Sequence, residues 1–169
     1  MKKLYTLSTL LFFSFLFYSC GSDKPDDLPV SINATAEKSF TITAQAGDVT
    51  TKTITFTLDD FAKLKDYKKY VDSGVIQTSS FIEVKGVSGD VELVDVKLSM
   101  NRDPKNNFTL PDITKNEKYQ GINELNFLDI IIKEVSSRGT STVKLEYKSN
   151  TSFTSPVIVS LYLNSVFSF

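Results

Sequence analysis

The sequence predicts a mainly β protein, built as an antiparallel β-sandwich of about seven or eight strands with one or two short helices. Threonine is concentrated between Thr41 and Thr57, and β-branched residues favour pleated strands over helices. Apolar and polar residues alternate in several short segments, as expected where one face of each strand packs on a core. Residues 20–169 are enough for one domain with its own core. Such a pattern is typical of immunoglobulin-like or jelly-roll-like sandwiches.

The first 19 residues have the pattern of a secretory signal peptide. Lys2 and Lys3 give a positive start, and residues 4–18 carry no charge. As a helix this apolar run would span about 22 Å, which is shorter than the roughly 30 Å hydrocarbon core of a bilayer. A charged start, a short apolar core and small residues after it predict a leader that is removed on export. The alternative is a permanent single-span anchor.

Cys20 is the only cysteine in the chain, so it has no partner for an intramolecular disulfide. The run Phe17-Tyr18-Ser19-Cys20 resembles the lipobox of bacterial (Bacteroidota-type) outer-membrane and surface lipoproteins, although Phe17 and Tyr18 are bulkier than the residues usual there. The resemblance implies cleavage before Cys20 and acylation of that cysteine. Several acyl chains on one residue would then hold the protein on a lipid bilayer.

The segment after the cysteine, residues 22–27, is rich in aspartate. It is similar to the acidic signal that directs such lipoproteins to the cell surface; a solvated linker is the alternative. The resemblance therefore implies a lipid-anchored protein of the outer membrane, on the periplasmic face or at the cell surface. We expect three parts: a signal peptide at 1–19, a lipidated cysteine and flexible tether at 20–36, and a β-sandwich domain at 37–169.

The first two strands of the sandwich are predicted at residues 38–45 and 50–58. The turn Ala46-Gly47-Asp48 between them predicts a hairpin, and a further strand at 30–36 could precede it. Alternation then stops, and Asp59-Asp60 is placed to cap a short helix that ends near Gly74.

This predicted helix has an apolar and a basic face. The residues expected to point inward are Phe61, Leu64 and Val71. The residues expected to point outward are Lys63, Lys65, Lys68 and Lys69. We interpret the four lysines as the solvated face of the helix rather than as a site for an anionic partner.

Two more strands are predicted at residues 81–85 and 91–100, with a bulge or two-sided burial near Leu93. Residues 101–121 are polar and irregular, and Phe108, Leu110 and Ile113 are expected to pin them to the body. Loops of this length are usually functional or disordered. We therefore expect residues 101–121 to form a contact surface for a partner.

Residues 122–136 fit two patterns. Ile122, Leu125, Leu128, Ile132 and Val135 form one helical stripe, whereas the run of β-branched isoleucines at 130–132 suits a strand. The helix explains the longer stretch and is preferred. Strands follow at residues 140–148 and 157–169.

Composition removes most catalytic chemistries. The chain has no histidine, so a Ser-His-Asp triad and imidazole metal ligands are excluded. With Cys20 acylated, no thiol nucleophile or thiolate zinc site is left. Without the leader the net charge is −3, which gives no electrostatic basis for binding nucleic acid. We expect a protein that is not an enzyme, with no catalytic, cofactor-binding or metal-binding residues.

Two weaker patterns remain. Asp59 with Asp60, and Asp103 with Asn106 and Asn107, are candidate oxygen ligands for Ca²⁺, but caps and turns account for such clusters more often. Five tyrosines are candidates for a sugar platform, although partial burial is the more common role. They are Tyr67, Tyr70, Tyr119, Tyr147 and Tyr162.

These observations predict a membrane-anchored lipoprotein with a non-catalytic binding or structural β-sandwich domain. The partner, a glycan or a protein, is left open. The alternatives are a fimbrial or adhesin-like subunit that pairs edge strands between protomers, and a carbohydrate-handling accessory protein.

Overall fold

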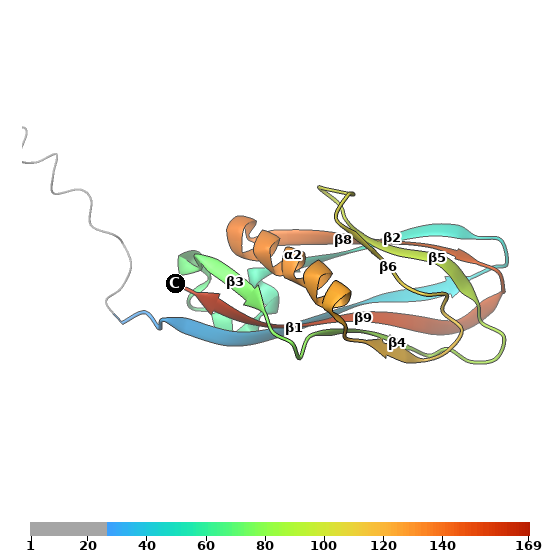
Figure 1. Cartoon of the computed structure of the whole chain (residues 1–169), viewed down its shortest axis with the longest axis horizontal. Helices are drawn as coiled ribbons and strands as arrows, with labels where there is room; N and C mark the ends of the chain where they lie inside the picture. The colour runs from blue at the N-terminus through green and yellow to red at the C-terminus, as the bar shows by residue number, and fades with distance from the viewer. Residues whose placement is uncertain (1–26) are drawn as a thin grey trace, which may run out of the picture.

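Two antiparallel sheets face each other across a continuous apolar core (Figure 1). The computed structural model describes residues 27–169. The predicted signal peptide, Cys20 and residues 21–26 of the tether lie outside these residues. The first sheet contains β1 (Ser31–Ala44), β9 (Phe153–Ser168), β4 (Phe81–Lys85) and β7 (Glu117–Tyr119), in that order, and β3 (Ser73–Ile76) also pairs with β9. The second contains β2 (Val49–Thr57), β8 (Thr140–Ser149), β5 (Leu93–Met100) and β6 (Asn107–Thr109).

The predicted antiparallel β-sandwich is therefore confirmed, with nine strands among residues 27–169. Alternation decides which side chains meet between the sheets, since successive residues of a strand point to opposite faces. Large fully buried side chains come from both sheets, among them Phe40, Phe56, Leu98, Tyr147 and Phe167.

The predicted hairpin between the first two strands is wrong. β1 pairs with β9, and β2 pairs with β8, so the turn at 45–48 carries the chain from one sheet to the other. The turn is held by the neighbouring loop: Gly47 N–H donates to Ser149 O at 2.8 Å, and Ser149 N–H donates to Asp48 O at 2.9 Å. A Gly-Asp turn reverses the chain in either arrangement, and the pairing is decided by distant strands.

The start of the sandwich lies earlier than predicted. β1 begins at Ser31, and residues 31–36, which the sequence analysis assigns to the tether, are paired with β9. Ala34 and Ala36 are buried on the inner face of this extension. The separate strand considered at 30–36 is thus the first half of β1.

The segment after β2 does not form the predicted single helix. It contains three short 3₁₀ turns: η1 (Leu58–Asp60), η2 (Ala62–Leu64) and η3 (Lys68–Tyr70). Phe61 and Leu64 are nevertheless fully buried, as predicted. Gly74 belongs to β3 rather than to a helix end, and a Cβ there would lie 2.7 Å from the Ile132 side chain. The glycine allows close packing against the helix α2 (Ile122–Arg138).

Residues 101–121 are more ordered than predicted. They contribute β6 to the edge of one sheet and β7 to the edge of the other, and Leu110 and Ile113 are buried between them. The predicted irregularity in β5 is present: its register with β8 shifts between Val94 and Lys97, where Asp95 has a φ of 54°.

The helical alternative for residues 122–136 is confirmed by α2 (Ile122–Arg138). Gly139 ends it in the left-handed conformation, with φ of 76° and its N–H bonded to Val135 O at 2.8 Å. The buried face consists of Phe127, Leu128, Ile131, Ile132 and Val135. Ile122, expected on this face, is 70% exposed, since the helix begins beyond the edge of the core.

α2 packs against β3 of one sheet and β8 of the other, across the side of the sandwich (Figure 1). Neither α2 nor the short 3₁₀ turns of residues 27–169 combine the length and the hydropathy needed to cross a membrane.

Candidate functional site

A bulge in β9 shapes a hollow at one end of the sandwich. Ile42 of β1 faces Val157, but Ala44 faces Phe153, so the single residue Thr43 lies opposite the three residues 154–156. Pro156 within this stretch has no N–H to offer a neighbouring strand. The extra residues bend β9 and redirect its side chains, as bulges do where they adjoin binding sites.

The bulge depends on a glycine in a neighbouring strand connection. Gly86, which follows β4, has a φ of 79°, and a Cβ on it would lie 2.4 Å from the Pro156 carbonyl oxygen. A side chain at position 86 would therefore be strained by its backbone conformation and would collide with the bulge. Gly86 lets β4 and the bulged part of β9 remain in contact.

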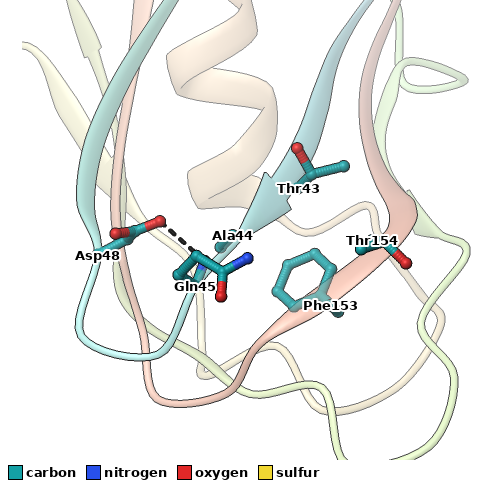
Figure 2. Close-up of a pocket in the computed structure, with 6 residues that line it drawn as sticks. All are labelled: Thr43, Ala44, Gln45, Asp48, Phe153 and Thr154. Carbon is teal, nitrogen blue, oxygen red and sulfur yellow. Dashed lines mark hydrogen bonds between the residues drawn. The ribbon is translucent and has the colours of Figure 1, made fainter.

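The hollow has a volume of about 450 Å³. Its lining residues are Thr43, Ala44, Gln45, Asp48, Phe153 and Thr154. Figure 2 shows the Phe153 ring between the side chains of Gln45 and Thr154. The ring is half-buried, whereas Thr43, Gln45, Asp48 and Thr154 are exposed.

Hydrogen bonds fix the loop that carries the polar groups. Gln45 N–H donates to Asp48 Oδ2 at 2.8 Å, which holds the carboxylate on the rim of the hollow (Figure 2). Ala46 N–H donates to Ser152 Oγ at 2.9 Å and so connects the β1–β2 turn to the β8–β9 loop. The side-chain amide of Gln45 and the hydroxyls of Thr43 and Thr154 complete the polar rim.

The chemistry of this hollow suits reversible binding. One apolar ring face stands beside a carboxylate, an amide and two hydroxyls, a combination that can bury an apolar surface and orient a polar one. A pyranose ring has both kinds of surface, with C–H groups on its faces and hydroxyls at its edge. Among residues 27–169 there is no cluster of three or more acidic residues that could hold a metal ion.

The five tyrosines considered for a sugar platform do not come together. Tyr147 is buried, and Tyr67 lies edge-on to Phe169 with ring centroids 5.8 Å apart. Tyr162 stacks on Phe81 at 4.8 Å on the outer face of the first sheet.

Two of these tyrosines have a raised pKa. Burial, the nearby Glu117 carboxylate and the hydrogen bond from its own hydroxyl to Glu117 raise the pKa of Tyr119 to about 12. Burial also raises the pKa of Tyr147. Both phenols are therefore held in the neutral form.

The carboxylates considered for Ca²⁺ are engaged with other groups. Asp59 and Asp60 form ion pairs with Lys68 and Lys38. Asp103 accepts hydrogen bonds from Lys105 N–H at 3.3 Å and from Asn106 Nδ2 at 3.2 Å, and so stabilises the turn between β5 and β6. These residues act as caps and turn residues, in line with the more common role of such clusters.

A second hollow region runs between α2 and the β5–β6 connection. It consists of two spaces of about 440 and 300 Å³ that share Asn106 and Ile130. One wall comes from residues 102–109, part of the loop expected to contact a partner, and the other from α2. The contact itself stays a prediction.

None of the residues that line the hollow beside β9 was identified from the sequence. One signal was present: Pro156 interrupts a run of strand residues, and proline inside a strand indicates an edge or a bulge. The proximity of residues 43–48 to 153–154 depends on the pairing of β1 with β9, and the predicted hairpin obscured it.

Comparisons with known proteins add only a general likeness. No protein-family model and no curated protein matches the chain. Among solved structures, a decameric BFDV capsid protein is similar with a TM-score of 0.43 at 14% identity, covering 82% of this chain and 98% of that one. A Desmodium yellow mottle tymovirus structure has a TM-score of 0.40 at 14% identity, covering 87% and 95%. Likenesses at this level concern the path of the chain and carry no functional argument.

Proposed function

We propose that this chain is an exported lipoprotein, anchored in the outer membrane by acyl chains on Cys20, whose β-sandwich is a non-catalytic binding module. The hollow around Phe153 is its binding site, and a neutral sugar is the ligand that the hollow suits best. The lipobox-like run and the lone cysteine support the anchor. The half-buried ring with its polar rim supports the site.

One geometric observation joins the two parts of the proposal. β1 begins at Ser31, on the side of the tether, and ends at Ala44, beside the hollow. A strand of this length spans roughly 45 Å at about 3.3 Å per residue. The two ends of β1 lie at opposite ends of the sandwich (Figure 1), so the hollow beside Ala44 is far from the point where the chain enters. A tether at the first end would direct the hollow away from the bilayer.

The anchor is tested by metabolic labelling with a clickable fatty acid. The parent chain incorporates the label and partitions with membranes, whereas Cys20→Ala loses the label and becomes soluble. A labelled Cys20→Ala variant, or an unlabelled parent that retains Met1, would refute the lipoprotein assignment.

The binding site is tested on an array of neutral and acidic glycans with the purified full chain. Binding is expected to be lost in Phe153→Ala and weakened at least tenfold in Asp48→Asn. Phe81→Ala is the matched control, because Phe81 is another half-buried ring on the first sheet, at a distance from the hollow. An array without hits, or equal losses in Phe153→Ala and Phe81→Ala, would remove the sugar site and leave the anchor untouched.

A further inference from the structure

The groove between α2 and the β5–β6 connection has the features of a peptide-binding site. Its two spaces, of about 440 and 300 Å³, follow α2 from Asn123 to Arg138. At about 1.5 Å per helical residue the groove is roughly 22 Å long. Such a length accommodates an extended segment of about six residues.

The wall opposite α2 is a free strand edge. Main-chain bonds join β5 to the chain on both sides of β6: Met100 N–H to Asn106 O, and Leu110 N–H to Val96 O, both 2.9 Å. Every second residue of an antiparallel strand turns its main chain to the same side. The N–H and C=O groups of Asn107 and Thr109 therefore point away from β5. They offer four main-chain groups to an added strand.

The space beside this edge has apolar surface at one end. The ring centroids of Phe108 and Phe127 lie 6.3 Å apart, and Ile130 lines both spaces. Phe108 and Ile130 are half-buried. An apolar side chain of an added strand would remove this surface from water, which favours binding.

The rim of the groove is basic. Arg102 and Lys105 are exposed on the β5–β6 connection, and Lys133 and Arg138 rise from α2. The acidic groups facing them are Asp103, Asp129 and Glu134. Asp103 is bonded within its turn, Asp129 pairs with Lys133 at 2.7 Å, and Glu134 pairs with Arg138 at 3.6 Å.

The excess charge lies on the β5–β6 side of the groove. No ion pair involves Arg102 or Lys105 within residues 27–169. Asp103 is bonded only to neutral donors and keeps its negative charge, so Arg102, Lys105 and Asp103 together carry one net positive charge. Acidic side chains on a bound segment would therefore meet two cations that have no ion-pair partner of their own among residues 27–169.

From these features we infer that the groove binds an extended acidic peptide segment of a partner protein, which adds to sheet β2-β8-β5-β6 as a fifth strand along β6. Main-chain bonds to Asn107 and Thr109 provide the affinity that does not depend on sequence. Acidic and apolar residues at alternate positions provide the specificity, toward Arg102 and Lys105 on one side and Phe127 and Ile130 on the other. This inference does not depend on the membrane anchor or on the sugar site.

The experiment uses the full chain with Cys20→Ser, selected against random twelve-residue peptides displayed on phage. Enriched peptides are expected to alternate acidic and apolar residues. One of them, made synthetically with a fluorescent label, is then titrated by anisotropy. Thr109→Pro removes one N–H from the free edge without removing a bond to β5, and should weaken binding at least tenfold.

Thr53→Pro is the matched control. Thr55 O accepts a bond from Lys38 Nζ on the open side of β2, so Thr53, of the same parity, also turns its main chain outward. The substitution removes an equivalent N–H from the opposite edge of the same sheet and should leave binding unchanged. Circular dichroism and thermal unfolding establish that both proline variants are folded.

A second variant keeps the inference falsifiable if Thr109→Pro does not fold. The double substitution Arg102→Glu with Lys105→Glu alters only exposed side chains and should weaken binding of the acidic peptide at least tenfold. The inference is overturned if no peptide is enriched, or if the charge reversal leaves the affinity unchanged. A dimer in sedimentation that Thr109→Pro dissociates would assign the edge to a second copy of this chain instead.

Discussion

Lys38 and Asp60 join the two sheets at the level of single residues. Lys38 Nζ donates to Thr55 O at 2.6 Å and pairs with Asp60 Oδ1 at 2.9 Å. Thr57 N–H donates to Asp60 Oδ2 at 2.7 Å. Partial burial acts to raise the pKa of Asp60, but the bonds to Lys38 and Thr57 outweigh it and hold the pKa below its usual value. The lysine also occupies a carbonyl on the edge of β2, which limits pairing with other strands there.

Asp60→Asn should therefore destabilise the sandwich by about 1–2 kcal/mol at pH 7. A lowered pKa in the folded state means that the stabilisation is complete above the carboxyl's unfolded pKa, near 4, and is lost as the pH falls through the folded value. Urea unfolding of both proteins at pH 7 and pH 3 measures this. An equal difference in free energy of unfolding at the two pH values would contradict the assignment.

Substitutions at Gly86 and Gly89 distinguish the cost of a strained backbone conformation from the cost of a steric clash. Both have positive φ, 79° and 63°, but a Cβ at 89 meets nothing within 4 Å, whereas one at 86 meets Pro156 O at 2.4 Å. Gly89→Ala should cost about 1 kcal/mol from conformation alone. Gly86→Ala should cost a further 1–3 kcal/mol from crowding and should also weaken binding at the hollow beside β9. Denaturant midpoints of the two variants give the comparison. Equal midpoints would show that the bulge relaxes around the added Cβ without a cost in stability.

Among the elements, β9 holds the first sheet together. It pairs with β1 on one side and with β4 and β3 on the other. Phe167 near its end is fully buried, edge-on to Phe61 with centroids 4.9 Å apart.

Phe167→Ala should reduce the free energy of unfolding by about 3–5 kcal/mol, because it leaves a cavity between the sheets. Phe169→Ala serves as the control, since Phe169 is only half-buried and should cost much less. Thermal unfolding of the two variants tests the assignment, and a similar loss in both would mean that the strand end is not anchored in the core.

Local patterns in the sequence predicted where individual strands and helices lie better than they predicted which strands pair with each other. The alternation at 81–85 matches β4, and the stripe across 122–136 with Gly139 matches α2, because each depends on its own residues. The predicted hairpin was wrong because Ala46-Gly47-Asp48 specifies a reversal of the chain but not which strand pairs with β1 or with β2. The segment predicted as a helix after Asp60 forms 3₁₀ turns instead, because Phe61 and Leu64 reach the core without a regular helical stripe.

The candidate site was beyond sequence analysis for the same reason. Thr43 and Phe153 are 110 positions apart and meet only through the register of β1 with β9. Gly86, which supports the bulge, is 70 positions from Pro156 in the chain. The long polar connection at 101–121 is visible in the sequence itself, and residues 102–109 of it line the hollows beside α2. That this connection contacts a partner stays a prediction.

For the whole molecule, the fimbrial or adhesin-like alternative depends on open strand edges shared between copies. In the second sheet, Lys38 covers part of the β2 edge, and β6 exposes the main-chain groups of only two residues. The first sheet has its edges at β1 and β7, and the short turn η2 packs against β1. We therefore expect the Cys20→Ser chain to sediment as a monomer at micromolar concentration. Heat-resistant oligomers in the same experiment would favour the fimbrial alternative.

The pairing of β1 with β9 has a consequence for how the protein reaches its destination. The strand made first in the sandwich finds its main partner in the strand made last, and such long-range pairing forms slowly because a large loop must close beforehand. The first sheet is therefore incomplete for as long as β9 is still being synthesised. In the export route proposed above, this topology would delay completion of the first sheet until β9 has crossed the secretion channel.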